Sequence, residues 1–138
     1  IRFNPAIKSM NYLGNTLAKI ESTRLGAFEP LFYNKDGFIT ECAIRNIFFI
    51  KKKVLYTPNL KLGILSGVMR ETIINIAVKL SLKIKQCYIP HETINDMEEA
   101  FISSTGIGLL ECYWKGWKSK HTITKQIKKE LFKRIKNN

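Results

Sequence analysis

The sequence lacks the features of membrane, secreted and metal-binding proteins. No apolar run approaches the ~20 residues that cross a bilayer, and residues 1–5 have no long apolar stretch typical of a secretory signal. There are three cysteines, which are widely spaced without a Cys-x-x-Cys pair, and two histidines. These shortages argue against a membrane span, a disulfide framework, a zinc site and a histidine-based triad. We therefore expect a cytoplasmic protein with no metal site.

The Rossmann glycine fingerprint and the P-loop are also missing. Acidic residues are scarce: 11 stand against 23 lysines and arginines, giving a net charge of +12. Within residues 115–136, nine basic residues accompany one acid, Glu130. Such a run forms either a surface for nucleic acid or other polyanions, or the solvated face of a terminal helix. We favour the solvated face, because a Lys-Gly pair between Trp114 and Trp117 indicates a tight turn rather than an open stacking platform.

The 138 residues, 45% of them hydrophobic, are enough for one folded domain. Met10, Leu13, Leu17 and Ile20 recur at helical spacing and predict a helix over residues 9–24 with one apolar face. Turn residues predict a hairpin connection at 34–37 and a reversal at 51–53. Further strands are expected at residues 27–33, 46–50, 54–56, 83–89, 100–103 and 109–113.

Three more helices are expected after residue 67. One spans residues 68–81 and buries Ile73, Ile76, Ala77 and Leu80, and a short one spans 93–99 with Thr93 as N-cap. Thr122 is expected to cap the last helix, with Ile123, Ile127, Leu131 and Ile135 facing inward. Together these elements predict one α/β (α+β) domain over residues 1–138, with mixed sheets and hairpins flanked by helices.

Several separated residues are suited to holding pyridoxal 5'-phosphate. This cofactor needs an amine for a Schiff base, a carboxylate at its pyridine nitrogen and donors for its phosphate, ideally at a helix N-terminus. Lys8 offers the amine, Glu41 the carboxylate, residues 67–69 the start of a predicted helix, and Thr105 a hydroxyl before a glycine. Each residue alone also suits an ordinary surface, strand-end or turn position. The hypothesis depends on their joint order.

That order resembles the class IV (fold-type IV) pyridoxal-phosphate enzymes, which include branched-chain and D-amino-acid aminotransferases and aminodeoxychorismate lyase. The resemblance runs from about residue 7 to residue 110. It is carried by Ile7-Lys8-Ser9-Met10-Asn11-Tyr12-Leu13, Asp36-Gly37-Phe38-Ile39-Thr40-Glu41 with Asn46-Ile47-Phe48, Tyr56-Thr57-Pro58, Gly63-Ile64-Leu65-Ser66-Gly67-Val68-Met69-Arg70, and Ala100-Phe101-Ile102-Ser103-Ser104-Thr105.

The resemblance implies a role for each matching residue. Lys8 would be the Schiff-base and catalytic lysine, and Arg70 would have no direct role. The other implied cofactor contacts are Glu41 at the pyridine nitrogen, Tyr12 near the ring hydroxyl, Leu65 on the ring face, and the Gly67-Val68-Met69 backbone with the Thr105 hydroxyl at the phosphate.

Four positions depart from the family pattern. Cys42-Ala43 replaces the usual Gly-Ser, Arg45 stands where small or polar residues are common, and Met69 replaces a threonine. Some aminodeoxychorismate lyases share the Thr-Glu-Cys run and the Met-Arg pair, whereas residues 103–106 are closer to the aminotransferases. The resemblance therefore leaves two reactions open.

The family's N-terminal domain precedes its lysine, but only seven residues precede Lys8 here. We therefore expect this chain to be the cofactor-binding C-terminal domain of an aminotransferase-like enzyme, homodimeric when intact, that transfers an amino group between an amino acid and a 2-oxo acid. The alternative reaction is release of pyruvate and 4-aminobenzoate from aminodeoxychorismate. An alternative of another class is an inactive remnant or basic polyanion-binding module. No membrane or nucleic-acid partner is expected.

Overall fold

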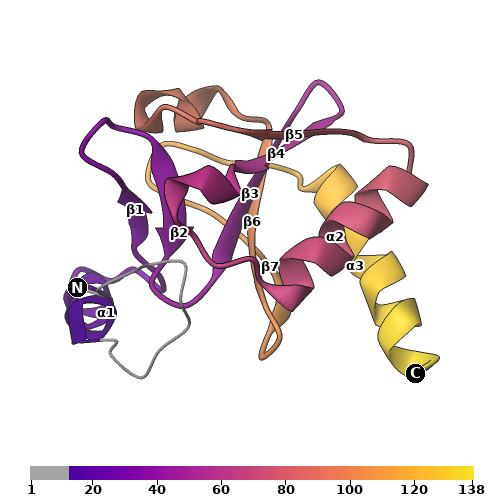
Figure 1. Cartoon of the computed structure of the whole chain (residues 1–138), viewed down its shortest axis with the longest axis horizontal. Helices are drawn as coiled ribbons and strands as arrows, with labels where there is room; N and C mark the ends of the chain where they lie inside the picture. Colours follow the sequence, from indigo (N-terminus) through magenta and orange to yellow (C-terminus); the bar gives the residue numbers. More distant parts are fainter. Residues whose placement is uncertain (1–12) are drawn as a thin grey trace.

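A computed structural model describes residues 13–138 and has a mixed α/β architecture (Figure 1). Helix α1 (Leu13–Arg24) lies beside a small antiparallel sheet of β1 (Leu31–Tyr33) and β2 (Ile39–Cys42). A five-stranded sheet follows, in the order β5-β4-β3-β6-β7. Its strands and the remaining helices are β3 (Asn46–Lys51), β4 (Val54–Pro58), η1 (Leu60–Leu62), α2 (Val68–Lys79), β5 (Lys83–Cys87), η2 (His91–Asp96), β6 (Glu99–Ser104), β7 (Gly108–Glu111) and α3 (Thr122–Lys136).

Strand β3 lies at the centre of the larger sheet and is covered on both faces. Phe48 and Ile50 belong to the core cluster beneath α2 and α3, whereas Ile47 and Phe49 belong to the cluster on the opposite face. A strand buried on both sides is apolar without alternation, which explains the continuous run in the sequence. The prediction of a buried strand over residues 46–50 is confirmed.

The two predicted reversals are confirmed by their backbone geometry. The Asn34 side-chain oxygen accepts the backbone N–H groups of Asp36 and Phe38, both at 3.0 Å. Gly37 has φ +82° in the same connection, where a side chain would be strained. Lys52 and Lys53 both have positive φ, as a two-residue hairpin turn requires.

Strand β1 is shorter than the predicted strand over residues 27–33. The backbone N–H of Ala27 donates to the Ser22 carbonyl at 2.7 Å, and that of Gly26 donates to Thr23 at 3.0 Å. These bonds satisfy carbonyl groups at the C-terminal end of α1. The chain up to residue 27 therefore completes the helix, and regular pairing starts only at Leu31.

The predicted short helix over residues 93–99 is present with other bounds, and Thr93 is not its N-cap. A 3-10 helix, η2, starts after Pro90, and the Thr93 hydroxyl donates to the Pro90 carbonyl at 2.7 Å. Glu99 belongs to β6, where its backbone position pairs with Ile50. From this position in the strand its side chain caps helix α3.

Glu99 caps helix α3. The sequence predicted Thr122 as the cap, and that prediction is wrong. The Glu99 carboxylate accepts the backbone N–H groups of Ile123 at 2.9 Å and Thr124 at 2.7 Å. The Thr124 hydroxyl also donates to it, at 2.6 Å. His121, with φ +51°, occupies the N-cap position, so Thr122 already lies inside the helix.

Two predicted apolar faces are only partly covered. In α3, Ile127 and Leu131 are buried, but Ile135 is 51% exposed near the end of the helix. Along α1, Leu13 and Leu17 are 65% and 57% exposed among the described residues. The side-chain amide of Asn15 donates to the Ala43 carbonyl at 2.6 Å, so polar contacts hold this helix. Within residues 13–138, no helix is long and apolar enough to span a membrane.

Candidate functional site

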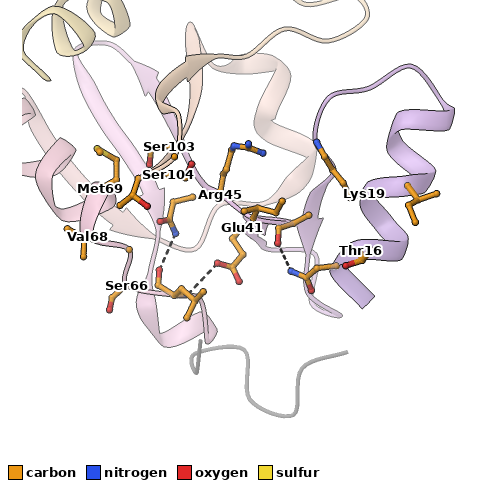
Figure 2. Close-up of a pocket in the computed structure, with 18 residues that line it drawn as sticks. Thr16, Lys19, Glu41, Arg45, Ser66, Val68, Met69, Ser103 and Ser104 are labelled. Carbon is orange, nitrogen blue, oxygen red and sulfur yellow. Dashed lines mark hydrogen bonds between the residues drawn. The ribbon is translucent and has the colours of Figure 1, made fainter. Parts of the chain in front are cut away.

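Segments from several parts of the chain surround one cavity of about 880 Å³. Helix α1, the ends of β2 and β6, the start of β3 and the start of α2 form its walls (Figure 2). Lys8 and Tyr12, two of the predicted site residues, lie outside the described residues. The structure brings the six others together around this cavity: Glu41, Leu65, Gly67, Val68, Met69 and Thr105.

Glu41 supplies a carboxylate at the cavity wall from strand β2. It is 7% exposed, and its Oε2 accepts the backbone N–H of Leu65 at 3.4 Å. Figure 2 shows this bond reaching from the strand to the turn ahead of α2. A buried carboxylate requires hydrogen-bonding partners, and this bond also fixes the turn relative to β2.

The turn before α2 is held from its other side by Asn46, at the start of β3. The Asn46 amide donates to the Leu65 carbonyl at 3.1 Å. Its side-chain oxygen lies so close to Gly67 that a Cβ there would collide with it. Gly67 has extended backbone angles, φ −61° and ψ 140°. This position therefore needs glycine for space, and not for positive φ.

Helix α2 begins at Val68, and no side chain within residues 13–138 caps its first turn. The first N–H groups of a helix have no intrahelical partner, and the helix dipole favours an anion near them. Val68 and Met69 both line the cavity. The first turn of α2 therefore provides an anion-binding end to the cavity.

The end of β6 forms the neighbouring wall. Asn46 pairs with Ser103 across β3 and β6, so the two polar residues lie side by side. Ser103 is 1% exposed, and its hydroxyl oxygen has no hydrogen-bond partner among the described residues. Ser104 and Thr105 continue this wall. The site therefore has hydroxyl groups close to the start of α2.

Arg70 points away from this cavity, although it follows Met69 directly. Its Nη2 donates to the Pro58 carbonyl at 3.1 Å and to the Gln86 side chain at 2.8 Å. It lines a second cavity of about 410 Å³ together with Gln86. Burial lowers the pKa of the Arg70 guanidinium from its ordinary value. Arg70 joins α2 to the ends of β4 and β5.

Sequence reasoning gave no role to Asn46, or to an ion-pair cluster at the α1 side of the cavity. In that cluster Glu29, whose side chain is 5% exposed, accepts from Lys19 at 3.0 Å and from Arg45 at 2.7 Å. Both cations also lie over the Phe28 ring, 4.2 and 5.0 Å from its centre. The available signals were an asparagine opening an apolar strand and an arginine at an unusual position.

The three cysteines are free thiols. Burial raises the pKa of Cys42, next to Glu41, well above its ordinary value, and raises that of Cys112 to about 12. Thiols with raised pKa remain protonated at neutral pH and are poor nucleophiles. Among residues 13–138, no group of three or more histidine, cysteine, aspartate or glutamate side chains could hold a metal ion.

Comparison with known proteins relates the chain to one family. Residues 1–112 match the sequence profile described as amino-transferase class IV. A putative branched-chain-amino-acid aminotransferase of Methanocaldococcus jannaschii is 33% identical over 110 residues, which are 80% of this chain and 38% of that protein. The chain therefore spans well under half the length of this relative.

Two solved structures share the fold. A branched-chain amino acid aminotransferase of Thermobaculum terrenum, in its PLP-bound form, superposes with a TM-score of 0.91 at 27% identity, covering 96% of this chain and 46% of that one. A putative 4-amino-4-deoxychorismate lyase of Legionella pneumophila superposes with a TM-score of 0.88 at 25% identity, covering 93% of this chain and 49% of that one.

Proposed function

Because the chain belongs to the class IV aminotransferase family, we propose that residues 1–138 act as one cofactor-binding domain of a pyridoxal-phosphate-dependent enzyme. Its reaction would transfer an amino group between an amino acid and a 2-oxo acid. One observation carries the proposal. Six residues chosen from the sequence for this cofactor come from β2, the turn before α2, α2 itself and the end of β6, and all six line one cavity.

The groups around the cavity suit pyridoxal phosphate. A buried carboxylate, Glu41, lies on one wall, and the uncapped first turn of α2 lies on another. Gly67 precedes that turn and lets Asn46 pack against it, since a Cβ there would collide with the Asn46 side-chain oxygen. The Ser103 hydroxyl, which has no hydrogen-bond partner in the part of the chain that the structure describes, lies at the same wall as Thr105. This combination of an acid, free N–H donors and hydroxyls matches a cationic ring that carries a phosphate.

When bound, the cofactor supplies an electron sink for charge that develops at the substrate α-carbon. Glu41 would hold a proton at the pyridine nitrogen, and Leu65 would pack on the ring face. The N–H groups of Val68 and Met69, which follow Gly67, would bind the phosphate.

Three hydroxyl- or amine-bearing residues complete the proposed site. Thr105 would donate its hydroxyl to the phosphate, and Tyr12 would donate to the ring hydroxyl oxygen. Lys8 would attach the cofactor through its amine. Its amine would also remove and return the substrate α-proton, as general base and acid.

One protein of similar structure supports a second reaction. The Legionella protein named as a putative 4-amino-4-deoxychorismate lyase shares the fold over 93% of this chain. The Thr40-Glu41-Cys42 run and the Met69-Arg70 pair also fit the lyases. The alternative proposal is therefore release of pyruvate and 4-aminobenzoate from aminodeoxychorismate. A homodimeric assembly and a cytoplasmic location complete both proposals, and they rest on the family alone.

The test measures covalent attachment of the cofactor to this chain. The purified protein is titrated with pyridoxal phosphate, treated with borohydride and digested, and the modified lysine is identified by mass spectrometry. We expect one dominant reduced adduct, on Lys8. The Lys8→Ala variant should lose it, whereas Lys35→Ala, at an exposed position in the β1–β2 connection, should retain it.

Three outcomes distinguish the hypotheses. The same adduct in the Lys8→Ala protein would disprove the assignment of Lys8. Absence of any specific adduct, together with salt-sensitive binding to nucleic acid, would favour a basic polyanion-binding module that uses the lysines of α3. Formation of 4-aminobenzoate from aminodeoxychorismate, without amino transfer, would favour the lyase.

A further inference from the structure

Helix α1 forms one wall of the cavity, yet apolar packing contributes little to its position. Within Leu13–Arg24, only Ser22 is buried. The apolar side chains of Leu13, Leu17 and Ile20 are 65%, 57% and 51% exposed. Most helices in proteins are fixed by burial of an apolar face. Specific polar contacts therefore have a large share in placing this wall.

Two side chains of α1 donate hydrogen bonds to residues outside the helix, and both bonds lead to the turn formed by residues 43–45. The Asn15 amide donates to the Ala43 carbonyl at 2.6 Å. The Lys19 ammonium donates to Glu29 Oε2 at 3.0 Å. All three residues of the 43–45 turn line the cavity together with α1, whereas Glu29 is not among the lining residues.

Glu29 connects the helix to this turn through both of its carboxylate oxygens. Oε1 accepts the backbone N–H of Ile44 at 3.0 Å. Oε2 accepts the guanidinium of Arg45 at 2.7 Å, in addition to the Lys19 ammonium. In Figure 2, Lys19 extends from α1 on the side of Arg45. The Glu29 side chain is 5% exposed, so these charge-assisted bonds are little screened by solvent.

The 43–45 turn joins the two residues that support the start of α2. It lies between Glu41, in β2, and Asn46, in β3. Glu41 accepts from the Leu65 N–H, and Asn46 donates to the Leu65 carbonyl. The contacts of Glu29 therefore connect α1 to the part of the chain that carries the carboxylate proposed for the pyridine nitrogen.

This connection matters for attachment of the cofactor. The Lys8 amine would form a carbon–nitrogen double bond with the cofactor aldehyde and release one water. Lys8 precedes Leu13, the first residue of α1, by five residues in the sequence, so the position of α1 limits where that amine can lie. Glu41 and α2 would hold the cofactor. A misplacement of reacting groups by about 1 Å can slow a reaction by about 100-fold.

From these contacts we infer that Glu29 is a positioning residue of this site. It holds α1 against the 43–45 turn from outside the cavity, and so promotes attachment of the cofactor to Lys8 without touching the cofactor. This inference rests on the proposed function. It gives a role to a buried acid that belongs neither to the sequence pattern nor to the cavity wall.

The test separates attachment from binding. The rate at which saturating pyridoxal phosphate attaches to Lys8 is followed by borohydride trapping and mass spectrometry. Calorimetry gives the dissociation constant of pyridoxamine phosphate, which has no aldehyde and cannot attach. In Glu29→Gln, the amide NH2 must face a donor whichever way the side chain is turned, because both carboxylate oxygens accept hydrogen bonds.

We expect Glu29→Gln to slow attachment by ~10- to 100-fold. The dissociation constant of pyridoxamine phosphate should change by less than about threefold, because Glu29 does not line the cavity. A variant that merely destabilises the fold would affect both quantities alike. In the apo protein, the amides of α1 should also exchange with solvent faster relative to those of β3.

Further variants control for charge and folding. Glu29→Asp keeps the carboxylate and should recover part of the rate. Glu21→Gln changes an exposed acid of α1 that pairs with Arg24, and it should leave both quantities unchanged. If Glu29→Gln fails to fold, Lys19→Gln decides, because it breaks the contact of Glu29 with α1 and should slow attachment with the same selectivity.

Each result has a defined meaning. An unchanged rate of attachment, or equal losses of attachment rate and pyridoxamine phosphate affinity, would overturn the role of Glu29 while leaving the proposed function intact. A wild-type chain that binds neither form of the cofactor, or forms no adduct on Lys8, would instead refute the proposed function and the inference with it. A selective loss of attachment rate, with partial recovery in Glu29→Asp, supports the inference.

Discussion

The contact between Asn46 and Gly67 makes a quantitative prediction about the turn that precedes α2. Replacing Gly67 by alanine adds a Cβ that would collide with the Asn46 side-chain oxygen, whereas the next atom outside that side chain, Arg70 Cβ, is at an ordinary 3.8 Å. The backbone angles of Gly67 suit alanine, so the expected cost is steric. Overpacking of this kind destabilises proteins by about 1–3 kcal/mol.

Asn46→Ala should be destabilising for a different reason. It removes the amide that donates to the Leu65 carbonyl at 3.1 Å and leaves that carbonyl without this partner. We expect a loss of about 1–3 kcal/mol in the free energy of unfolding. In this background, however, Gly67→Ala no longer meets the amide oxygen. It should then be nearly neutral, or stabilising by about 0.4–1 kcal/mol because alanine restricts the unfolded chain.

A double-mutant cycle measures this difference. Urea unfolding of the wild type, both single variants and the double variant, followed by circular dichroism, should give a coupling energy of about 1–4 kcal/mol. Gly106→Ala is the matched control at the same cavity, because the nearest atom to its Cβ is at 3.9 Å, and it should be nearly neutral in both backgrounds. Equal costs of Gly67→Ala with and without Asn46 would refute the steric reasoning.

Two further predictions concern stability. Glu99→Gln should lower the free energy of unfolding by about 1–3 kcal/mol, because an amide replaces the carboxylate that accepts from Ile123 and Thr124; a urea midpoint equal to that of the wild type would contradict the cap. Cys112 has a folded pKa of about 12 against an ordinary 9.0, so it retains its proton in the folded state while the unfolded chain releases it. Stability should therefore fall by up to about 1.4 kcal/mol per pH unit as pH rises from about 9 towards 12, and Cys112→Ser should remove that component of the slope.

Local patterns were sufficient to predict most of the secondary structure. The apolar run after Asn46, the residues of the 34–37 connection and the helical spacing of Ile73, Ile76 and Ala77 all correspond to observed elements. The errors occurred where a distant residue determines local structure. Thr93 and Thr122 are plausible caps in sequence, but the α3 cap comes from Glu99, 24 residues before Ile123. The residues neighbouring Thr122 in the sequence do not include Glu99, so they could not predict this cap.

For the candidate site too, local patterns were predicted and contacts between distant residues were not. The pattern of residues predicted which side chains gather at the cavity, since Glu41, Gly67 and Thr105 all line it. It did not predict how the turn before α2 is supported. Asn46 supports it through tertiary contacts with Leu65 and Gly67. The ion pair of Arg45 with Glu29, 16 residues earlier, was not predicted either. The roles of Lys8 and Tyr12, which lie outside the described residues, stay predictions.

The central position of β3 has a consequence for the dynamics of the site. This strand contributes Phe48 and Ile50 to one core cluster, Ile47 and Phe49 to the other, and Asn46 to the turn before α2. Small local fluctuations cannot separate the site from the strand that organises both clusters. We expect the amides of β3 to exchange with solvent only through global unfolding, and bound cofactor to slow that exchange by the full extent to which it stabilises the protein. Loss of the site and loss of the fold should then be one cooperative event.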